Sequence, residues 1–133
     1  MLEMGPKKSI LVIDDDESVL IHLECLLEDS GYETTAVWSG QEGLSMLKSR
    51  SFDMVLLDDY LRDIRHEEIF SEIRRLELQP LIVLMESPLA SGPADHFLGL
   101  GGAAIVDKWA PCEQFAAEIR KCFESAALEA VPR

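Results

Sequence analysis

The chain has 133 residues, which suits one compact domain that buries a hydrophobic core of its own. Apolar residues make up 47% of the sequence and charged residues 28%, a balance that excludes general disorder. Asp and Glu number 25 against 12 for Lys and Arg. The resulting net charge of −13 opposes binding to phosphate backbones or anionic lipid, so we expect no direct nucleic-acid or membrane partner.

The apolar runs and the cysteines indicate the cellular compartment of the protein. The longest apolar runs, such as residues 81–85, are far shorter than the roughly 20 residues that a membrane span needs. The N-terminal residues do not have the apolar stretch of a signal peptide. The three cysteines, Cys25, Cys112 and Cys122, are odd in number and show no metal-ligand spacing. We therefore expect reduced thiols and a cytoplasmic location.

Short apolar runs alternate with stretches of helical spacing. Runs rich in Val, Ile, Leu or Thr predict five strands, at residues 9–14, 33–38, 53–58, 80–85 and 103–107. Apolar residues at i, i+1, i+4, i+7 and i+8 predict a helix over 16–30, which Gly31 ends with a left-handed residue. Apolar stripes predict two more helices around 69–76 and 115–123, and weaker patterns predict helices at 40–49 and 93–100.

A strand followed by a helix, five times over, predicts an α/β fold. Strands joined by helical crossovers run parallel, and right-handed crossovers cover both faces of the sheet. We expect a doubly wound, flavodoxin-like (βα)5 sandwich with strand order 2-1-3-4-5. The sequence shows no repeat or linker, so we expect one domain over residues 7–127, with flexible tails at 1–6 and 128–133.

Charged residues follow three of the predicted strands. Residues 14–17 are Asp-Asp-Asp-Glu, Asp58 and Asp59 end the third strand, and Asp107 and Lys108 end the fifth. Acids before a helix often only cap its first turn, and a single lysine is often a solvated charge. Here, however, the carboxyl ends of parallel strands meet at one rim, near the switch in strand order where ligands bind. Clustered carboxylates suit a hard cation such as Mg²⁺.

The sequence resembles the receiver (CheY-like) domain of two-component response regulators from residue 7 to about 125. Three segments carry the resemblance, in family order and at family-like separations: KSILVIDDDESVL, FDMVLLDD and GGAAIVDK. The resemblance implies a signalling domain rather than an enzyme. It implies a sensor histidine kinase or phosphotransfer protein as phosphoryl donor, and an effector protein as the receiver of the signal.

The resemblance also assigns roles to individual residues. Asp14 and Asp15 match the acidic pair that binds Mg²⁺, and Asp15 matches the more direct ligand. Asp58 matches the aspartate that accepts the phosphoryl group and also binds the metal. Tyr60 stands where a backbone carbonyl completes the metal site, and Lys108 matches the lysine that contacts the phosphoryl group. Successive strand side chains point to opposite faces, so Asp58 and Asp59 cannot share the pocket equally. We favour Asp58 because the apolar run at 55–57 ends immediately before it and the family register agrees.

Several positions depart from the family pattern. Met85 replaces the usual Thr or Ser at the end of the fourth strand, and a thioether cannot donate a hydrogen bond. Ser87 is two residues further on and is a candidate substitute. Ile105 replaces the aromatic switch residue of the fifth strand, and Trp109 replaces the proline after the lysine. Residues 61–66, LRDIRH, replace a turn that contains proline and glycine.

These residues are consistent with three hypotheses about function. In the first, Asp58 is phosphorylated and the change is transmitted by Tyr60 and the loop at 62–66. In the second, the degenerate Met85 and Ile105 mark a pseudo-receiver that acts as a phosphorylation-independent interaction or dimerisation module. Its interaction or homodimer face would lie on the fourth helix, fifth strand and fifth helix. In the third, the chain is a small Mg²⁺-dependent phosphatase, although Tyr60 stands where such enzymes carry a second acid.

Overall fold

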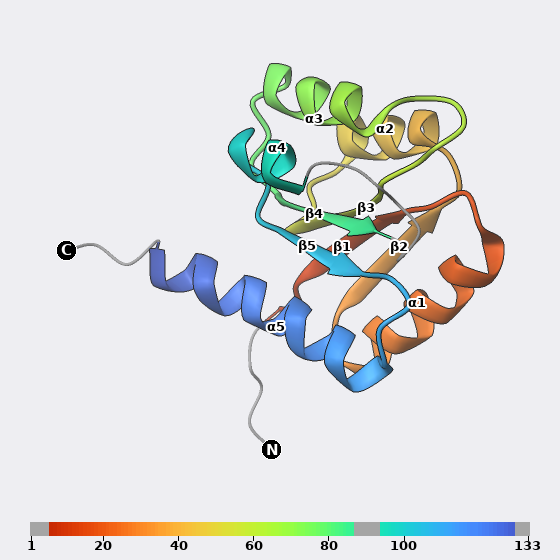
Figure 1. Cartoon of the computed structure of the whole chain (residues 1–133), viewed down its shortest axis with the longest axis vertical. Helices are drawn as coiled ribbons and strands as arrows, with labels where there is room; N and C mark the ends of the chain where they lie inside the picture. The colour runs from red at the N-terminus through yellow and green to blue at the C-terminus, as the bar shows by residue number, and fades with distance from the viewer. Residues whose placement is uncertain (1–5, 87–93, 130–133) are drawn as a thin grey trace.

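The computed structural model describes residues 6–86 and 94–129 of the chain. A five-stranded parallel sheet forms the middle layer (Figure 1). Its strands are β1 (Ser9–Ile13), β2 (Glu33–Val37), β3 (Met54–Asp58), β4 (Leu81–Glu86) and β5 (Ala104–Asp107). The strand order is β2-β1-β3-β4-β5, so the predicted doubly wound, flavodoxin-like sandwich is confirmed.

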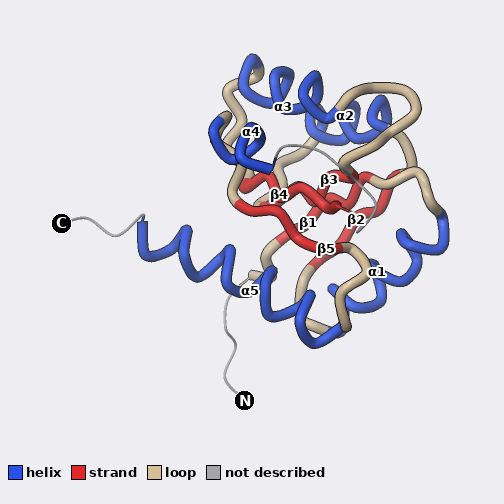
Figure 2. Tube along the Cα trace, viewed as in Figure 1, coloured by secondary structure: helices blue, strands red, loops and turns tan. Residues whose placement is uncertain are grey.

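Within residues 6–86 and 94–129, five helices cover the two faces of this sheet. They are α1 (Glu17–Asp29), α2 (Gly40–Ser49), α3 (His66–Arg75), α4 (Ala94–Gly99) and α5 (Cys112–Glu129). Helices α2, α3 and α4 lie on one face, and α1 and α5 lie on the other (Figures 1 and 2). In the part of the chain that the structure describes, no helix has the length and apolar content to span a bilayer.

Most predicted elements occur close to their expected bounds, and two helices extend further. Helix α3 begins at His66, ahead of its apolar stripe, and α5 continues to Glu129. Residues 128 and 129, which we expected in a flexible tail, are therefore helical. The rest of the two expected tails, except residue 6, lies outside the described residues, as does position 93 at the expected start of α4.

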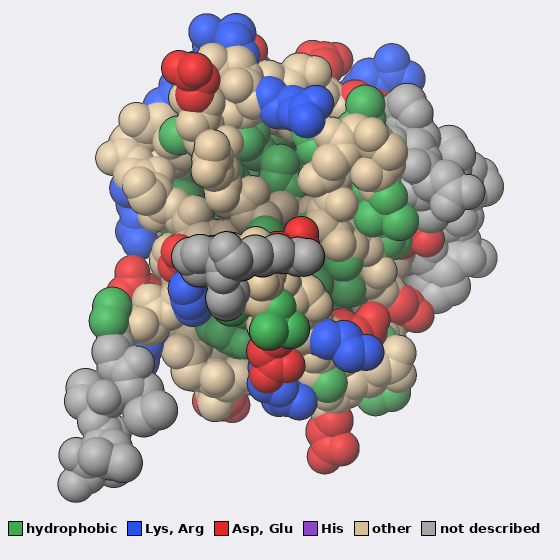
Figure 3. Space-filling model, turned by 90° about the vertical axis from the view of Figure 1, so that its left-hand side faces the viewer, with side chains coloured by type: hydrophobic (Ala, Val, Ile, Leu, Met, Phe, Trp, Pro, Cys, Tyr) green, Lys and Arg blue, Asp and Glu red, His purple; other side chains and the backbone are tan. Residues whose placement is uncertain are grey.

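Alternation along the strands divides the core into two clusters. Ile10 and Val12 of β1 pack with residues of α1 and α5, whereas Leu11 and Ile13 pack with residues of α2 and α3. The same alternation runs along β3. Because both faces are covered, the inner strands β1, β3 and β4 are largely apolar, whereas the edge strand β2 carries polar residues at 33–35 and is mostly only partly buried. On the face drawn in Figure 3, acidic and basic side chains are interspersed.

Local capping explains where the helices near the strand ends begin and stop. The Asp16 carboxylate accepts hydrogen bonds from the backbone N–H groups of Ser18 (2.9 Å) and Val19 (3.4 Å) at the start of α1. Gly31 has φ +98°, which confirms the predicted left-handed stop after that helix. Ser39 caps α2 by accepting from the Glu42 N–H at 3.1 Å. The Asp16 and Ser39 caps lie in the loops that follow the carboxyl ends of β1 and β2.

Candidate functional site

Three charged side chains converge at the carboxyl end of the sheet because of strand alternation. Asp14, Asp58 and Lys108 each stand two positions after a strand residue that packs under α1 and α5. Side chains two residues apart on a strand share a face, so all three point to the same side of the sheet. Strands β1 and β3 are neighbours, which brings the two carboxylates together.

Lys108 links the two buried carboxylates. Its Nζ donates to Asp14 Oδ2 at 2.8 Å and to Asp58 Oδ1 at 2.9 Å. The Asp14 side chain is fully buried and Asp58 is only 3% exposed. The other Asp14 oxygen accepts from the Asp16 backbone N–H at 2.9 Å. Buried charges need partners of this kind, so the pocket is an organised site rather than a solvated acidic surface.

Asp15 completes a cluster of three carboxylates. One oxygen from each of Asp14, Asp15 and Asp58 lies within 4.8 Å of the others. Asp15 is partly exposed, and its Oδ2 lies 3.6 Å from Nε of Arg62. Carboxylate oxygens are the ligands that Mg²⁺ prefers, and the open side at Asp15 leaves room for the waters that this ion retains. The donor set therefore fits a hard divalent cation held by these three residues.

Burial changes the proton affinity of the pocket. Burial raises the pKa of Asp58 to about 7; the hydrogen bond from Lys108 opposes this change, and the charge of Asp14 adds to it. For Lys108, burial alone would lower the pKa of the ammonium group, but its hydrogen bonds to Asp14 and Asp58 outweigh this effect and raise the pKa. Lys108 thus stays charged. A further positive charge nearby would favour the carboxylate form of Asp58.

The residues after Asp58 turn away from the cluster. Asp59 is partly exposed, its backbone N–H donates to the Met85 carbonyl at 3.0 Å, and its own carbonyl lies 3.1 Å from Nδ1 of His66. Tyr60 is 75% exposed. The structure therefore groups Asp58, and not Asp59, with Asp14 and Asp15.

The two switch positions are occupied by apolar side chains in the core. Met85 is fully buried on the α1/α5 side of the sheet and stands opposite Asp58 in the β3–β4 register. Ile105 is partly buried against the cluster under α2 and α3. Ser87, the candidate substitute for a hydroxyl, lies outside the described residues. Trp109 is exposed, with its ring centre 6.0 Å from Lys108 Nζ.

Sequence reasoning missed the contact between Arg62 and Asp15. The segment Leu-Arg-Asp-Ile at 61–64 gave one signal, because two charged residues between two apolar ones indicate a loop with buried anchors. That pattern does not predict that Asp15 is the partner of Arg62. The contact depends on the course of the loop between β3 and α3.

A family model described as the response regulator receiver domain matches residues 10–120. The chain belongs to this family. The match covers all five strands of this receiver domain except the first residue of β1. It therefore includes every residue of the acid pocket.

Two named relatives agree with this assignment. The receiver domain is 34% identical over 76 residues to the transcriptional regulatory protein AfsQ1 of Streptomyces coelicolor, covering 57% of this chain and 34% of that protein. It is 25% identical over 111 residues to DltR of Streptococcus agalactiae, covering 84% of this chain and 50% of DltR. The chain thus matches half or less of these relatives' length.

The fold is shared with solved receiver domains. A CheY-like receiver domain from Methanospirillum hungatei superposes with a TM-score of 0.84 at 22% identity, covering 94% of this chain and all of the other. At this level of identity, the likeness concerns the fold alone. The roles of individual pocket residues depend on the local geometry described above.

Proposed function

We propose that this receiver domain accepts a phosphoryl group on Asp58 from a histidine kinase or phosphotransfer protein in the cytoplasm. The observation that carries the proposal is the buried bridge of Lys108 between Asp14 and Asp58, at 2.8 and 2.9 Å. This arrangement holds a carboxylate nucleophile and a fixed cation in one pocket beside two further acids. Phosphoryl transfer needs mainly such positioning and charge neutralisation.

The chemistry is the formation of an acyl phosphate. An Asp58 oxygen attacks the phosphorus, the bond from phosphorus to the donor's imidazole nitrogen breaks, and its electron pair stays on that nitrogen. Lys108 pairs with a phosphoryl oxygen, while Asp14 and Asp15 remain as carboxylates. A divalent cation held by Asp14, Asp15 and Asp58, with the Tyr60 carbonyl, would neutralise the remaining charge.

An autophosphorylation assay tests this proposal. The domain is incubated with acetyl phosphate and Mg²⁺, and intact mass and Phos-tag electrophoresis measure the product. We expect one phosphoryl group on the wild type and on Asp59→Asn, which is the matched control. We expect none on Asp58→Asn and none after chelation of the metal. A wild-type chain that never gains a phosphoryl group would contradict the proposal.

The output passes, in this proposal, by protein–protein contact to an effector on the same or another chain. The change at Asp58 is passed on by the exposed Tyr60 and the loop at 62–66, whose Arg62 lies beside Asp15. The face of α4, β5 and α5, where Leu98 and the nearby Trp109 are exposed, would hold a constitutive partner contact that requires no change in β5. The relatives named as transcriptional regulators are longer than this domain, which is consistent with a signal handed to another part of the protein or to a partner.

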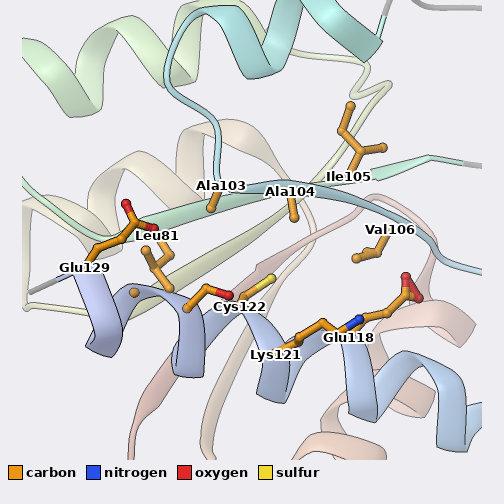
Figure 4. A pocket seen from close by; sticks show the side chains of 11 residues that line it. Leu81, Ala103, Ala104, Ile105, Val106, Glu118, Lys121, Cys122 and Glu129 are labelled. Atoms are coloured by element: carbon orange, nitrogen blue, oxygen red, sulfur yellow. The ribbon is translucent and has the colours of Figure 1, made fainter.

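A second candidate function is a pseudo-receiver that binds a partner or a second copy without phosphorylation. The buried Met85 and the ringless Ile105 favour it, as does a groove of about 330 Å³ between β5 and the C-terminal half of α5 (Figure 4). Ala104, Val106 and Cys122 are among the residues that line this groove. Sedimentation and partner binding that do not change with Mg²⁺ and beryllofluoride would support this alternative over the phosphorelay.

A further inference from the structure

The loop between β3 and α3 follows a fixed course on both sides of Arg62. Leu61 and Ile64 are buried in the core cluster under α2 and α3. The Asp63 carboxylate accepts hydrogen bonds from the backbone N–H groups of Gly40 (3.0 Å) and Gln41 (2.9 Å) at the start of α2. Arg62 is thus held between three anchored residues, although its own side chain is 87% exposed.

This course places Arg62 at the open side of the acid pocket. Its Nε lies 3.6 Å from Oδ2 of Asp15, whose side chain is 25% exposed. Lys108 pairs with the other two carboxylates, Asp14 and Asp58. Each of the three acids that could hold a cation therefore already has a positive side chain beside it. Of the two positive groups, Arg62 is the exposed one and the one that can leave at low cost.

We propose that Arg62 is a built-in counter-ion that competes with a divalent cation for Asp15 and lowers the affinity of the pocket for that cation. The inference rests on the proposed function of this pocket. Two positive groups cannot share the same oxygen without repulsion, so cation binding requires Arg62 to move away. Because an exposed ion pair is weak, the effect on affinity is modest, about 2- to 5-fold.

Calorimetric titration of the chelator-treated domain with Mg²⁺ tests this inference. The variants are Arg62→Ala, Arg62→Lys and Arg65→Ala. Arg65 is the matched control, because it is exposed in the same loop and makes no ion pair with a described residue. We expect Arg62→Ala to bind Mg²⁺ about 2- to 5-fold more tightly than the wild type and Arg65→Ala. We expect Arg62→Lys to lie close to the wild type, and the difference to shrink at high salt.

The outcomes separate this inference from the function on which it rests. If all variants bind Mg²⁺ and Arg62→Ala does not differ from Arg65→Ala, the competition is refuted while the metal pocket stands. If Arg62→Ala binds more weakly than the wild type, Arg62 assists the cation and the inference is also refuted. If no variant binds Mg²⁺, both the inference and the proposed Mg²⁺-dependent function fail. Equal melting temperatures of the variants show that the fold is unchanged.

Discussion

Asp58 is buried beside the carboxylate of Asp14, and this arrangement links the stability of the domain to pH. In the unfolded chain Asp58 loses its proton near the ordinary pKa of 3.8, whereas in the folded domain burial raises that pKa to about 7. Between these pH values the folded state binds more protons than the unfolded state. The free energy of unfolding therefore falls as the pH rises through this window.

The variant Asp58→Asn removes this pH-dependent cost. We expect it to raise the free energy of unfolding of the metal-free domain by roughly 1–3 kcal/mol at pH 8, and to change it much less at pH 4, where Asp58 is protonated in the folded state and still partly protonated in the unfolded state. Urea titrations with a chelator at the two pH values measure the difference. The control Asp59→Asn changes a partly exposed carboxylate and should show no such gain. An equal gain for Asp58→Asn at both pH values would contradict the account.

Position 85 pairs with Asp58 in the β3–β4 register, and in the proposed function its side chain decides whether a hydroxyl reaches the phosphoryl group. We expect Met85→Thr to cost roughly 1–3 kcal/mol of stability, because it removes apolar volume from a fully buried position. We also expect a larger phosphorylated fraction at steady state, because the new hydroxyl can donate to a charged oxygen. Met85→Val is the control, since it has the same shape without the hydroxyl. Phos-tag electrophoresis that finds the two variants equally phosphorylated would refute this role.

At the scale of elements, the turn from α4 to β5 depends on a close approach of backbone and ring. A Cβ added to Gly102 would overlap the ring of Phe97, which is buried. We expect Gly102→Ala to lower the free energy of unfolding by roughly 1–3 kcal/mol through overpacking. Gly99→Ala is the matched control, because a Cβ there meets nothing within 4 Å, and it should be neutral or slightly stabilising. Chemical denaturation that finds equal effects would contradict this packing.

The order of the elements was predictable because the inner strands are buried on both faces and form largely apolar runs, while the edge strand β2 is marked by the β-branched Thr34, Thr35 and Val37. The start of α3 was not predictable, since its first turn, His66 to Glu68, is polar and precedes the apolar stripe at Ile69. The end of α5 was not predictable either. Its last turns extend beyond the sheet (Figure 1) and have no core to bury, so no periodicity marks them.

The candidate site was predictable to a similar extent. Asp14, Asp58 and Lys108 stand at or one residue beyond the carboxyl ends of three strands of one sheet, so topology brings them to one rim, and the structure places them in contact. The pairing of Arg62 with Asp15 was not predictable, because it depends on a loop whose course is fixed by contacts distant in sequence, such as Asp63 with Gly40.

Across the whole domain, we expect phosphorylation to change one region more than the others. Ile105 has no aromatic ring to change position, whereas Tyr60 is exposed and Arg62 contacts the pocket. We expect Mg²⁺ with beryllofluoride to change amide hydrogen exchange mainly in residues 59–66, with little change in β5. Mass spectrometry of peptides from these segments measures the response. Changes in hydrogen exchange centred on β5 would show that the signal passes through β5 and not through residues 59–66.

In the proposed function, Asp14, Asp15, Asp58 and Lys108 form one phosphoryl-accepting, cation-binding pocket. A crystal structure with Mg²⁺ and beryllofluoride tests it most directly, because the fluoride complex stands in for a phosphoryl group on a carboxylate. We predict the beryllium on an Asp58 oxygen, a fluorine in contact with Lys108 Nζ, and the cation between Asp15 and Asp58. Beryllofluoride absent from Asp58, or a cation bound away from these carboxylates, would contradict the account.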